Sequence, residues 1–394
     1  MITTQAQFDL SSRNTFRMRV KCALFVEVTE EADLAALDWD ALPQPVLVMG
    51  GGSNLLFTKD FPGTVLHVAI CHSFHSCHSE RSEESRSEES RSEESWTLGA
   101  GVVFDDFCAR AASEGLWGPE NLSLIPGEVG ASAVQNIGAY GVEAKDIIAG
   151  IRAWDRTAAR FVEIDPAQCA YGYRTSRFKT EWKGRYVITA VTYRLSRTPQ
   201  PKLDYGGVRK ALEEIGVRIS PSGNSTSLRS VPAPPIPSGN GPLPLSMCGG
   251  AHVPEGLTFT PSTVREAIIG IRRQKLPDPA EVGSAGSFFC NPVISREHFD
   301  RIVATAREDN GPAYEVPHYD TPDGIKVPAA WMIDQCGFKG CRQGGAQVYP
   351  GQPLVIVNAT GTATPQEIIG LEQQIIQTIE RKYGITLHPE VEHV

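Results

Sequence analysis

The segment IPGEVGASAVQNIGAYG, from Ile125 to Gly141, has the residue types and spacing best suited to chemistry in this chain. Its glycines and other small residues alternate with apolar ones and with one amide pair, Gln135-Asn136. Small side chains let main-chain N–H groups approach a ligand closely, and glycine tolerates the positive φ angles that turn those donors inward. The segment therefore predicts a site for a phosphate-bearing cofactor.

A second glycine cluster, MGGGSN at 49–54, follows the apolar run VLVM. The usual dinucleotide fingerprint requires a further glycine that opens a helix, but Leu55 stands at that place and the following residues look extended. The pattern therefore argues against a Rossmann fold. The turn could still cradle a pyrophosphate through backbone donors, and a plain tight turn between strands remains the alternative.

The composition narrows the possible functions. The 394 residues carry a net charge of −9, which argues against a nucleic-acid partner because nucleic-acid binders present a basic face. The first residues lack a basic stretch followed by an apolar core, and no apolar run is long enough to span a membrane. We expect a cytoplasmic protein that is monomeric and has no membrane partner.

Nine scattered cysteines suit a reducing compartment. One cluster, Cys71-His72, His75 and Cys77-His78, has the residue types of a zinc site. Its spacing is irregular and it runs into low-complexity sequence, so we expect no metal there.

Two stretches are predicted to be insertions. Residues 73–95 contain RSEES three times in tandem, and 218–255 are dense in Pro, Gly and Ser. Neither can bury enough apolar surface to offset the entropy of ordering, so both are expected to be disordered loops. The rest mixes strands at 46–49, 186–195 and 353–358 with helices at 103–114, from Thr263 and from Thr364, which predicts an α+β fold.

Together, the two glycine motifs resemble the UDP-N-acetylenolpyruvoylglucosamine reductase family. The resemblance extends over most of the chain through NTF at 14–16, YGYRTSRFK at 171–179, KLPDP at 275–279, GSFFCNP at 286–292, WMIDQ at 331–335 and PEV at 389–391. It implies a two-subdomain FAD-binding fold of the vanillyl-alcohol-oxidase/PCMH-like type, followed by an α+β substrate-binding domain. The implied parts are 1–72 and 96–200 for FAD, 201–385 for substrate, and a tail, 386–394, carrying Glu390.

The same resemblance implies non-covalent FAD, NADPH as the reductant, and reduction of UDP-N-acetylglucosamine enolpyruvate to UDP-N-acetylmuramate, a step of peptidoglycan precursor synthesis. Ser287 matches the family's proton donor, while Arg174 and Glu390 match the groups that stabilise the enolate. The chemistry suits these residues. The forked guanidinium of Arg174 can bind a carboxylate, and Glu390 can stabilise the enolate anion if it is protonated or shares a proton. Without the resemblance, Ser287 would be interpreted as part of a turn, Arg174 as a member of a surface ion pair, and Glu390 as a solvated tail residue. Cys290 is an alternative proton donor, although burial as a small apolar residue is the commoner role of such a cysteine.

The family also implies two sets of binding residues. Those expected at the FAD are Gly50, Gly51, Gly52, Ser53, Asn54, Leu55, Pro126, Gly127, Gly130, Ala131, Ser132, Asn136, Gly138, Ala139 and Gly141. Those expected at the substrate are Tyr140, Tyr205, Lys275, Asn291 and Gln352.

Two departures leave alternatives open. The loop with Tyr205 leads toward the second insertion, and only four residues follow Glu390, which are expected to anchor it poorly and to lower activity. The alternatives are a catalytically impaired UDP-sugar-binding flavoprotein and another FAD oxidoreductase of the same fold.

Overall fold

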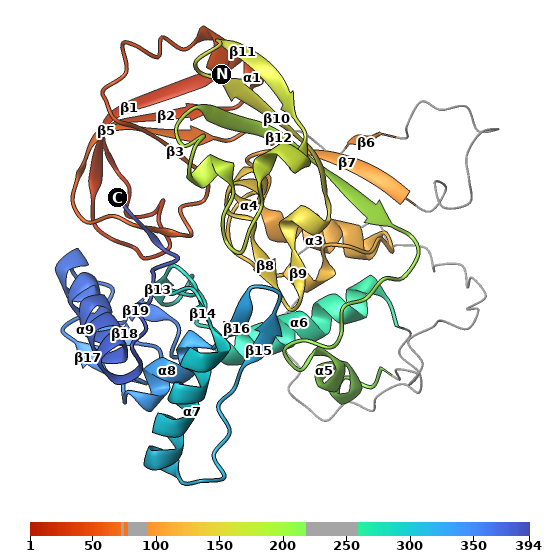
Figure 1. The fold of residues 1–394 in the computed structure, drawn as a ribbon. Helices are drawn as coiled ribbons and strands as arrows, with labels where there is room; N and C mark the ends of the chain where they lie inside the picture. The colour runs from red at the N-terminus through yellow and green to blue at the C-terminus, as the bar shows by residue number, and fades with distance from the viewer. Residues whose placement is uncertain (72–74, 78–92, 218–258) are drawn as a thin grey trace, which may run out of the picture.

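The computed structural model describes residues 1–71, 75–77, 93–217 and 259–394. Two sheets form the upper part of the molecule in Figure 1, and the C-terminal helices and small sheets form the lower part. None of the helices in the described ranges has the length and hydropathy that a bilayer-spanning segment requires.

The first sheet is built from the N-terminal region and has the strand order β1-β2-β5-β3. β1 pairs antiparallel with β2, whereas β5 runs parallel to both β2 and β3. Its elements are β1 (Ile2–Asp9), β2 (Lys21–Val28), α1 (Glu31–Ala36), β3 (Val46–Met49) and β5 (Phe61–Val68), with the short β4 (Leu55–Leu56) after the glycine turn.

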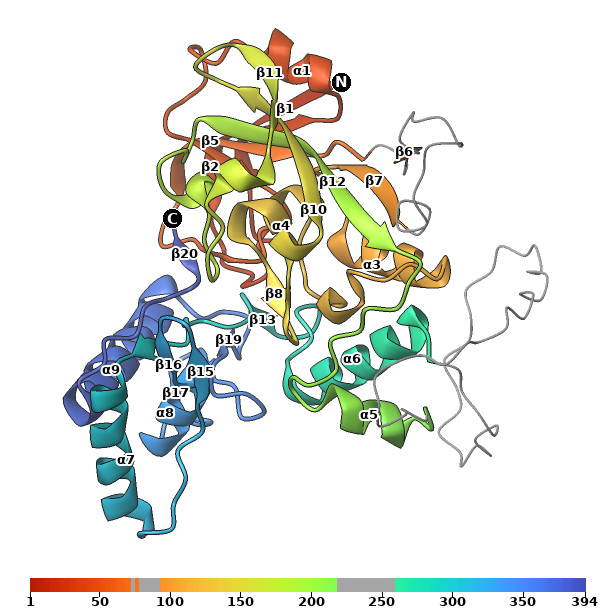
Figure 2. The same ribbon diagram turned by 45° about the vertical axis from the view of Figure 1, so that its right-hand side comes forward.

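The second sheet is antiparallel, in the order β11-β10-β12-β7-β6 (Figure 2). Its strands are β6 (His75–Cys77), β7 (Glu93–Gly99), β10 (Ile148–Asp155), β11 (Arg160–Ile164) and β12 (Tyr186–Ser196). Packed with it are α3 (Phe104–Ser113), α4 (Val129–Gln135), the pair β8 (Gly138–Ala139) and β9 (Val142–Glu143), and the 3-10 turns η2 (Glu120–Leu122), η3 (Ala144–Asp146), η4 (Pro166–Cys169) and η5 (Arg177–Lys179).

The C-terminal region holds two small sheets, β13-β19-β18-β17 and β14-β16-β15, among helices. Its strands are β13 (Gly283–Ser284), β14 (Val293–Ile294), β15 (Tyr319–Thr321), β16 (Gly324–Lys326), β17 (Arg342–Gln343), β18 (Ala346–Val348), β19 (Ile356–Asn358) and β20 (Glu392–His393). Its helices are α5 (Val208–Glu214), α6 (Pro261–Lys275), α7 (Arg296–Asn310), α8 (Ala329–Gln335) and α9 (Pro365–Tyr383).

The helix ends lie at residues that favour capping, and one of them, the start of α6, differs from the prediction. Thr364 caps α9 in a capping box with Glu367, and Gly384 ends that helix in the left-handed conformation, as predicted. α6 begins earlier than predicted. Thr260 is its cap, accepting a hydrogen bond from the Thr263 N–H, and Pro261 fits the first turn because it needs no donor there.

The first predicted insertion, 73–95, is narrower in the structure. Residues 75–77 form β6, which pairs with β7, and β7 begins at Glu93 and pairs with β12; these backbone ladders need no apolar side chain. At the β7 end, Arg197 pairs with Glu94, whose side chain is largely buried. The predictions for 78–92 and 218–255 lie outside the described residues, as do His72 and His78 of the cysteine and histidine cluster.

Candidate functional site

A long cavity runs along the glycine turn after β3 and the start of α4, and reaches the C-terminal region. Its lining includes Met49–Leu55, the first turns of α4, Arg174, η5 residues, Ala285–Ser287 and Glu390. Apolar side chains from both sheets, among them Val48 and Ile188, line it as well. A cavity that is mostly apolar with a few convergent polar groups suits a cofactor with a flat ring.

The turn after β3 fits the phosphates of such a cofactor. The main-chain N–H groups of Gly51, Gly52 and Ser53 donate to no other group in the described part of the chain, although the turn lines the cavity. Their neighbour Gly127 crosses the same cavity with a φ of +117°, next to the Ser53 hydroxyl. Free donors beside small residues are what a pyrophosphate requires.

Most residues expected at the FAD line this cavity, and three do not. Those that line it are Gly50, Gly51, Gly52, Ser53, Asn54, Leu55, Pro126, Gly127, Gly130, Ala131, Ser132 and Gly138. Ala139 and Gly141 lie outside the lining, in and after β8. Asn136 is fully buried, and its side chain donates to Glu143 and to the Gly172 carbonyl while accepting from the Lys145 N–H. Asn136 therefore holds the loop beyond α4 in place.

Gly52 offers a test of the turn. Its φ is +62°, and a Cβ there would collide with the carbonyl oxygen of Arg13. Gly52→Ala should cost about 1–3 kcal/mol from the backbone conformation alone, and more from the collision. We expect a protein with a lower Tm that is purified with little flavin, measured by its absorbance spectrum. Gly270→Ala is the control, because that glycine has open space around it; a flavin-replete G52A protein would contradict the assignment.

Arg174 and Glu390 form an ion pair in the cavity wall, with Arg174 Nε 3.1 Å from Glu390 Oε1. Both side chains are largely buried. The Arg174 guanidinium also donates to the Gly138 carbonyl, and Gln135 Nε2 donates to the same Glu390 oxygen at 3.2 Å. Asn54 links this network to the glycine turn by donating to Gln135 and to the Glu390 carbonyl.

Burial raises the pKa of Glu390 and of two neighbouring side chains. It raises the pKa of Glu390, against the opposing effect of Arg174 and Lys179. It also raises the pKa of Tyr173, and it raises the pKa of Cys290 to about 11. The Cys290 thiol therefore stays protonated near neutral pH, but Cys290 lies outside the cavity lining that includes Ser287, which weakens the case for Cys290.

Ser287 is held beside Glu390 by the segment that follows it. The Glu390 N–H donates to the Phe288 carbonyl, the Cys290 N–H donates to the His388 carbonyl, and Phe289 bridges Pro389. Residues distant in the sequence are thereby joined in a short antiparallel ladder. Arg174, Ser287 and Glu390 all line the one cavity.

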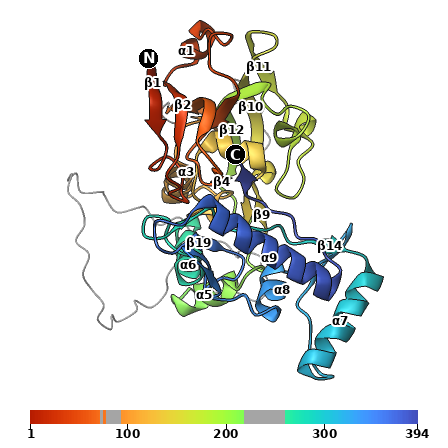
Figure 3. The ribbon, with the colours of Figure 1, turned by 90° about the vertical axis from the view of Figure 1, so that its left-hand side faces the viewer.

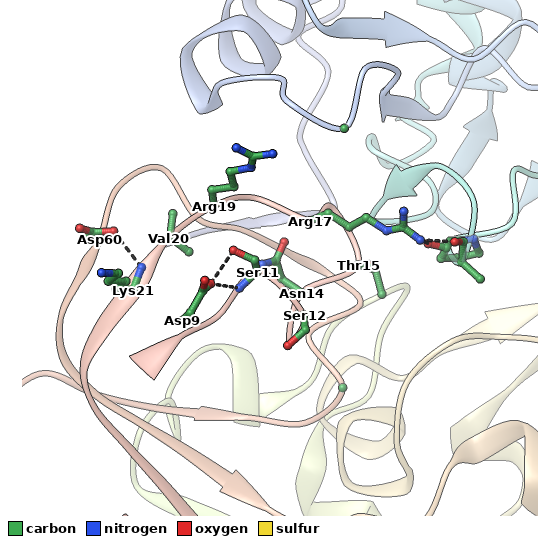
Figure 4. Close-up of a pocket in the computed structure, with 14 residues that line it drawn as sticks. Asp9, Ser11, Ser12, Asn14, Thr15, Arg17, Arg19, Val20, Lys21 and Asp60 are labelled. Carbon is green, nitrogen blue, oxygen red and sulfur yellow. Dashed lines mark hydrogen bonds between the residues drawn. The ribbon is translucent and has the colours of Figure 1, made fainter. Parts of the chain in front are cut away.

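The N-terminal motif NTF, at 14–16, holds the segment that leads to Ser287. The Thr15 carbonyl accepts from the Ser284 N–H, and the Phe16 carbonyl accepts from Asn358 Nδ2. A second, polar pocket has Gly51 in its lining, and Figure 4 shows Arg17 in it. The Arg17 guanidinium donates to the carbonyls of Pro279 and Ala280. These contacts fix the C-terminal region against the first sheet.

The short tail anchors Glu390 well, so the expectation of poor anchoring is wrong. β20 pairs in parallel with β4, and the Val394 N–H donates to the Leu56 carbonyl. Val391 is buried, and the Thr58 N–H and hydroxyl both donate to the Val394 carbonyl. Figure 3 shows the C-terminus returning to the first sheet beside β4. The backbone pairing of β20 with β4 therefore holds Glu390 in place.

The residues expected at the substrate lie outside the cavity lining. Tyr205 stacks on Tyr319 with ring centroids 5.5 Å apart, and Asn291 Nδ2 donates to the Tyr173 hydroxyl at 3.4 Å. Lys275 ends α6, and its carbonyl lies against Gly351, the neighbour of Gln352. The ring of Tyr140 packs on Gly206, next to Tyr205.

Gln135 and Arg272 are among the polar residues of this cavity that the sequence prediction missed. A signal existed for each. Gln135 stands four residues after Ala131 on α4, and Arg272 stands three before Lys275 on α6, so each shares a helix face with a predicted site residue.

Comparison with known proteins shows the family of the chain. Residues 22–163 match the family model of an FAD binding domain, and residues 278–394 match that of the UDP-N-acetylenolpyruvoylglucosamine reductase C-terminal domain. The UDP-N-acetylenolpyruvoylglucosamine reductase of Bacteroides fragilis (strain YCH46) is 38% identical over 391 residues, covering 99% of this chain and 100% of that relative. The one from Porphyromonas gingivalis (strain ATCC 33277) is 37% identical over 390 residues, covering 98% of each.

A solved structure supports the fold. The crystal structure of UDP-N-acetylenolpyruvylglucosamine reductase from Thermus caldophilus superposes with a TM-score of 0.57 over 100% of this chain and 98% of that one, at 18% identity. The predicted α+β fold with a two-subdomain FAD-binding part is thus confirmed. The chain belongs to the UDP-N-acetylenolpyruvoylglucosamine reductase family, flavin-dependent oxidoreductases of peptidoglycan synthesis with FAD as cofactor and NADPH as reductant.

Proposed function

We propose that this chain reduces UDP-N-acetylglucosamine enolpyruvate to UDP-N-acetylmuramate, prefers NADPH as reductant, and uses Arg174, Ser287 and Glu390 for the chemistry. The observation that carries the proposal is the convergence of these three side chains, from separate segments, on the cavity that the glycine turn borders. A guanidinium, a hydroxyl and a carboxyl beside a flavin site suit the reduction of a double bond conjugated to a carboxylate.

The reaction sets two demands on the protein. The methylene carbon of the substrate must receive a hydride, which reduced flavin supplies when bound, and the carbon bearing the carboxylate must receive a proton. Between the two events the substrate is an enolate with extra negative charge on its carboxylate oxygens. Arg174 meets that charge with a permanent cation whose forked donors match a carboxylate.

Ser287 is the proposed proton donor. A serine hydroxyl is a weak acid, so it can protonate only a strongly basic carbon and must be held in place to do so. The ladder to 388–390 and the β13 contacts to Thr15 supply that rigidity. The proposed contacts for the rest of the sugar nucleotide are Lys275, Tyr205, Asn291, Gln352 and Tyr140.

Glu390 is proposed to share its proton with the enolate carboxylate. Burial raises its pKa, and an anionic substrate beside it acts in the same direction. The protonated form is present below that raised pKa and is lost as the pH increases through it. The rate of substrate reduction is therefore expected to fall on the alkaline side with the loss of one proton.

Glu390→Gln tests this role. The amide donates a hydrogen bond at every pH, so the alkaline fall in the rate of substrate reduction should disappear, while the rate below it drops by about tenfold or more. The measurement is the pH profile of single-turnover substrate reduction by pre-reduced enzyme. Persistence of the same fall in E390Q would assign it to another group.

One experiment tests the function as a whole. The purified protein should be yellow and should oxidise NADPH only when the enolpyruvyl sugar nucleotide is added, with the lactyl ether as product. Bleaching by NADPH without turnover of that substrate would point to an impaired UDP-sugar-binding flavoprotein. Rapid peroxide formation with simple sugars would point to an oxidase of the same fold.

A further inference from the structure

His67, on β5, lies between two carboxylates and has no part in the proposed reaction. Its Nδ1 is 2.9 Å from Glu27 Oε2, and its Nε2 is 3.1 Å from Glu128 Oε1. His67 is only 7% exposed, and the Glu128 side chain is largely buried. A neutral imidazole has one N–H group and can donate to only one of two such acceptors. Because both ring nitrogens face carboxylate oxygens, the arrangement favours the doubly protonated, cationic form of His67.

The charged neighbours of His67 in the described part of the chain come from three segments. Glu27 is on β2, Glu128 precedes α4, and Arg13 pairs with Glu27 through Nη2 at 3.3 Å. β3, which pairs with β5 beside His67, has no titratable residue. Burial and the two carboxylates raise the pKa of the nearby Cys71 thiol, which stays neutral. Two cations thus balance two anions, and loss of the His67 proton leaves one negative charge in excess.

The balance of forces at His67 favours the proton. Desolvation acts to lower the pKa of His67, but the hydrogen bonds to Glu128 and Glu27 and the charge of Glu128 outweigh it, so the pKa is raised above its ordinary value. Arg13 opposes this rise. The cationic form is therefore present at acidic pH and is lost as the pH increases through the raised pKa.

Glu128 connects these charges to the glycine turn after β3. It lines the same cavity as the turn, with Oε2 3.0 Å from the place that a Cβ on Gly50 would take and Oε1 3.7 Å from that on Gly51. The free N–H groups of the turn suit the pyrophosphate of the cofactor. A carboxylate so close to them repels a phosphate unless a cation neutralises it. In the described ranges, His67 is the cation that pairs with Glu128.

We propose that His67 is a positioning residue for the cofactor, whose imidazolium neutralises Glu128 beside the pyrophosphate of FAD, so that FAD binds more weakly once His67 has lost its proton. The inference concerns the binding of FAD alone and does not need the enolpyruvyl substrate. By linkage, bound FAD raises the proton affinity of His67 by the same factor by which the proton raises the affinity for FAD. Binding of FAD should therefore take up protons in the pH range where His67 titrates.

The test is the dissociation constant of FAD, measured across pH by flavin fluorescence at constant ionic strength. In the wild type it should increase at least about tenfold between about pH 6 and about pH 9, with the loss of one proton. Glu128→Gln removes the charge that repels the pyrophosphate, so FAD should stay tightly bound over this range. His67→Gln should bind FAD weakly at every pH, and the H67Q and E128Q double variant should regain most of the affinity.

The matched control is His318→Gln, which removes an exposed histidine of the C-terminal region and should keep the wild-type pH dependence. A wild-type affinity for FAD that does not change with pH would overturn the proposal, as would the same fall in E128Q. A double variant that binds FAD as weakly as H67Q would show that His67 acts through packing and not through charge, which also overturns it.

Two further measurements keep the outcome clear. If H67Q does not fold, E128Q decides, because proton uptake on FAD binding in weakly buffered solution should be seen in the wild type and should largely disappear in E128Q. Turnover of the wild type with the sugar nucleotide is measured separately at saturating FAD, so failure of the proposed function is distinguished from failure of this inference.

Discussion

Ser287→Ala should leave the reduction of the flavin by NADPH nearly unchanged while slowing the reduction of the enolpyruvyl substrate by about 10²- to 10⁴-fold. The hydroxyl is needed only where a proton is delivered to carbon, and the NADPH half-reaction delivers none there. Rapid mixing resolves the two half-reactions, because the flavin absorbance falls in the first and recovers in the second.

The serine variant has a matched control. Ser284→Ala lies three residues earlier, in β13, and should affect both half-reactions little. If S287A slowed both half-reactions equally, Ser287 would be shaping the cavity and the donor would have to be another group. A normal thermal unfolding midpoint for S287A would exclude loss of the fold as the cause, since the Ser287 side chain forms no hydrogen bond within the described chain.

The elements could be predicted from the sequence wherever a few neighbouring residues determine them. Thr364, Glu367 and Gly384 fix both ends of α9 through local capping, and the structure has them as predicted. The start of α6 was wrong because two threonines, Thr260 and Thr263, stand three apart and both can cap. Pro261, which favours the first turn, was the signal that separates them.

The site could be predicted only where a motif marks it. The glycine turn and Arg174 lie in recognisable segments, and they line the cavity together. The pairing of the segment after Ser287 with the one before Glu390 is a long-range backbone ladder, and no local pattern encodes it. The same holds for the tail, where four residues looked too few until their partner β4 was known.

Asn136 shows how a motif residue can serve a different purpose from its neighbours. Its φ of +48° ends α4 in the left-handed conformation, which asparagine tolerates because its short side chain can hydrogen-bond locally. Its side-chain amide forms hydrogen bonds with Glu143, the Gly172 carbonyl and the Lys145 N–H. Residue type and position alone could not distinguish this structural role from contact with the flavin.

Arg174→Met should lower the rate of substrate reduction by about 10²- to 10³-fold, the usual cost of removing one preorganised group that stabilises charge in a transition state. The loss has two sources. The enolate carboxylate loses its fixed cation, and Glu390, nearly buried, loses its ion-pair partner. Removal of Arg174 should raise the pKa of Glu390 further, since Arg174 is the first of the charges that lower it.

Arg174→Lys separates these two sources. Lysine keeps the positive charge but not the forked donors, so the alkaline fall governed by Glu390 should return toward its wild-type pH while the maximal rate stays well below wild type. The measurement is the single-turnover rate of pre-reduced enzyme across pH, with Arg160→Met, which removes an exposed arginine of β11, as the control. A wild-type rate in R174M would show that Arg174 takes no part in the reaction. Additive losses of activation free energy in the R174M and E390Q double variant would show that the two side chains act on the substrate independently. Groups that act as one unit lose less together than the sum of their separate losses.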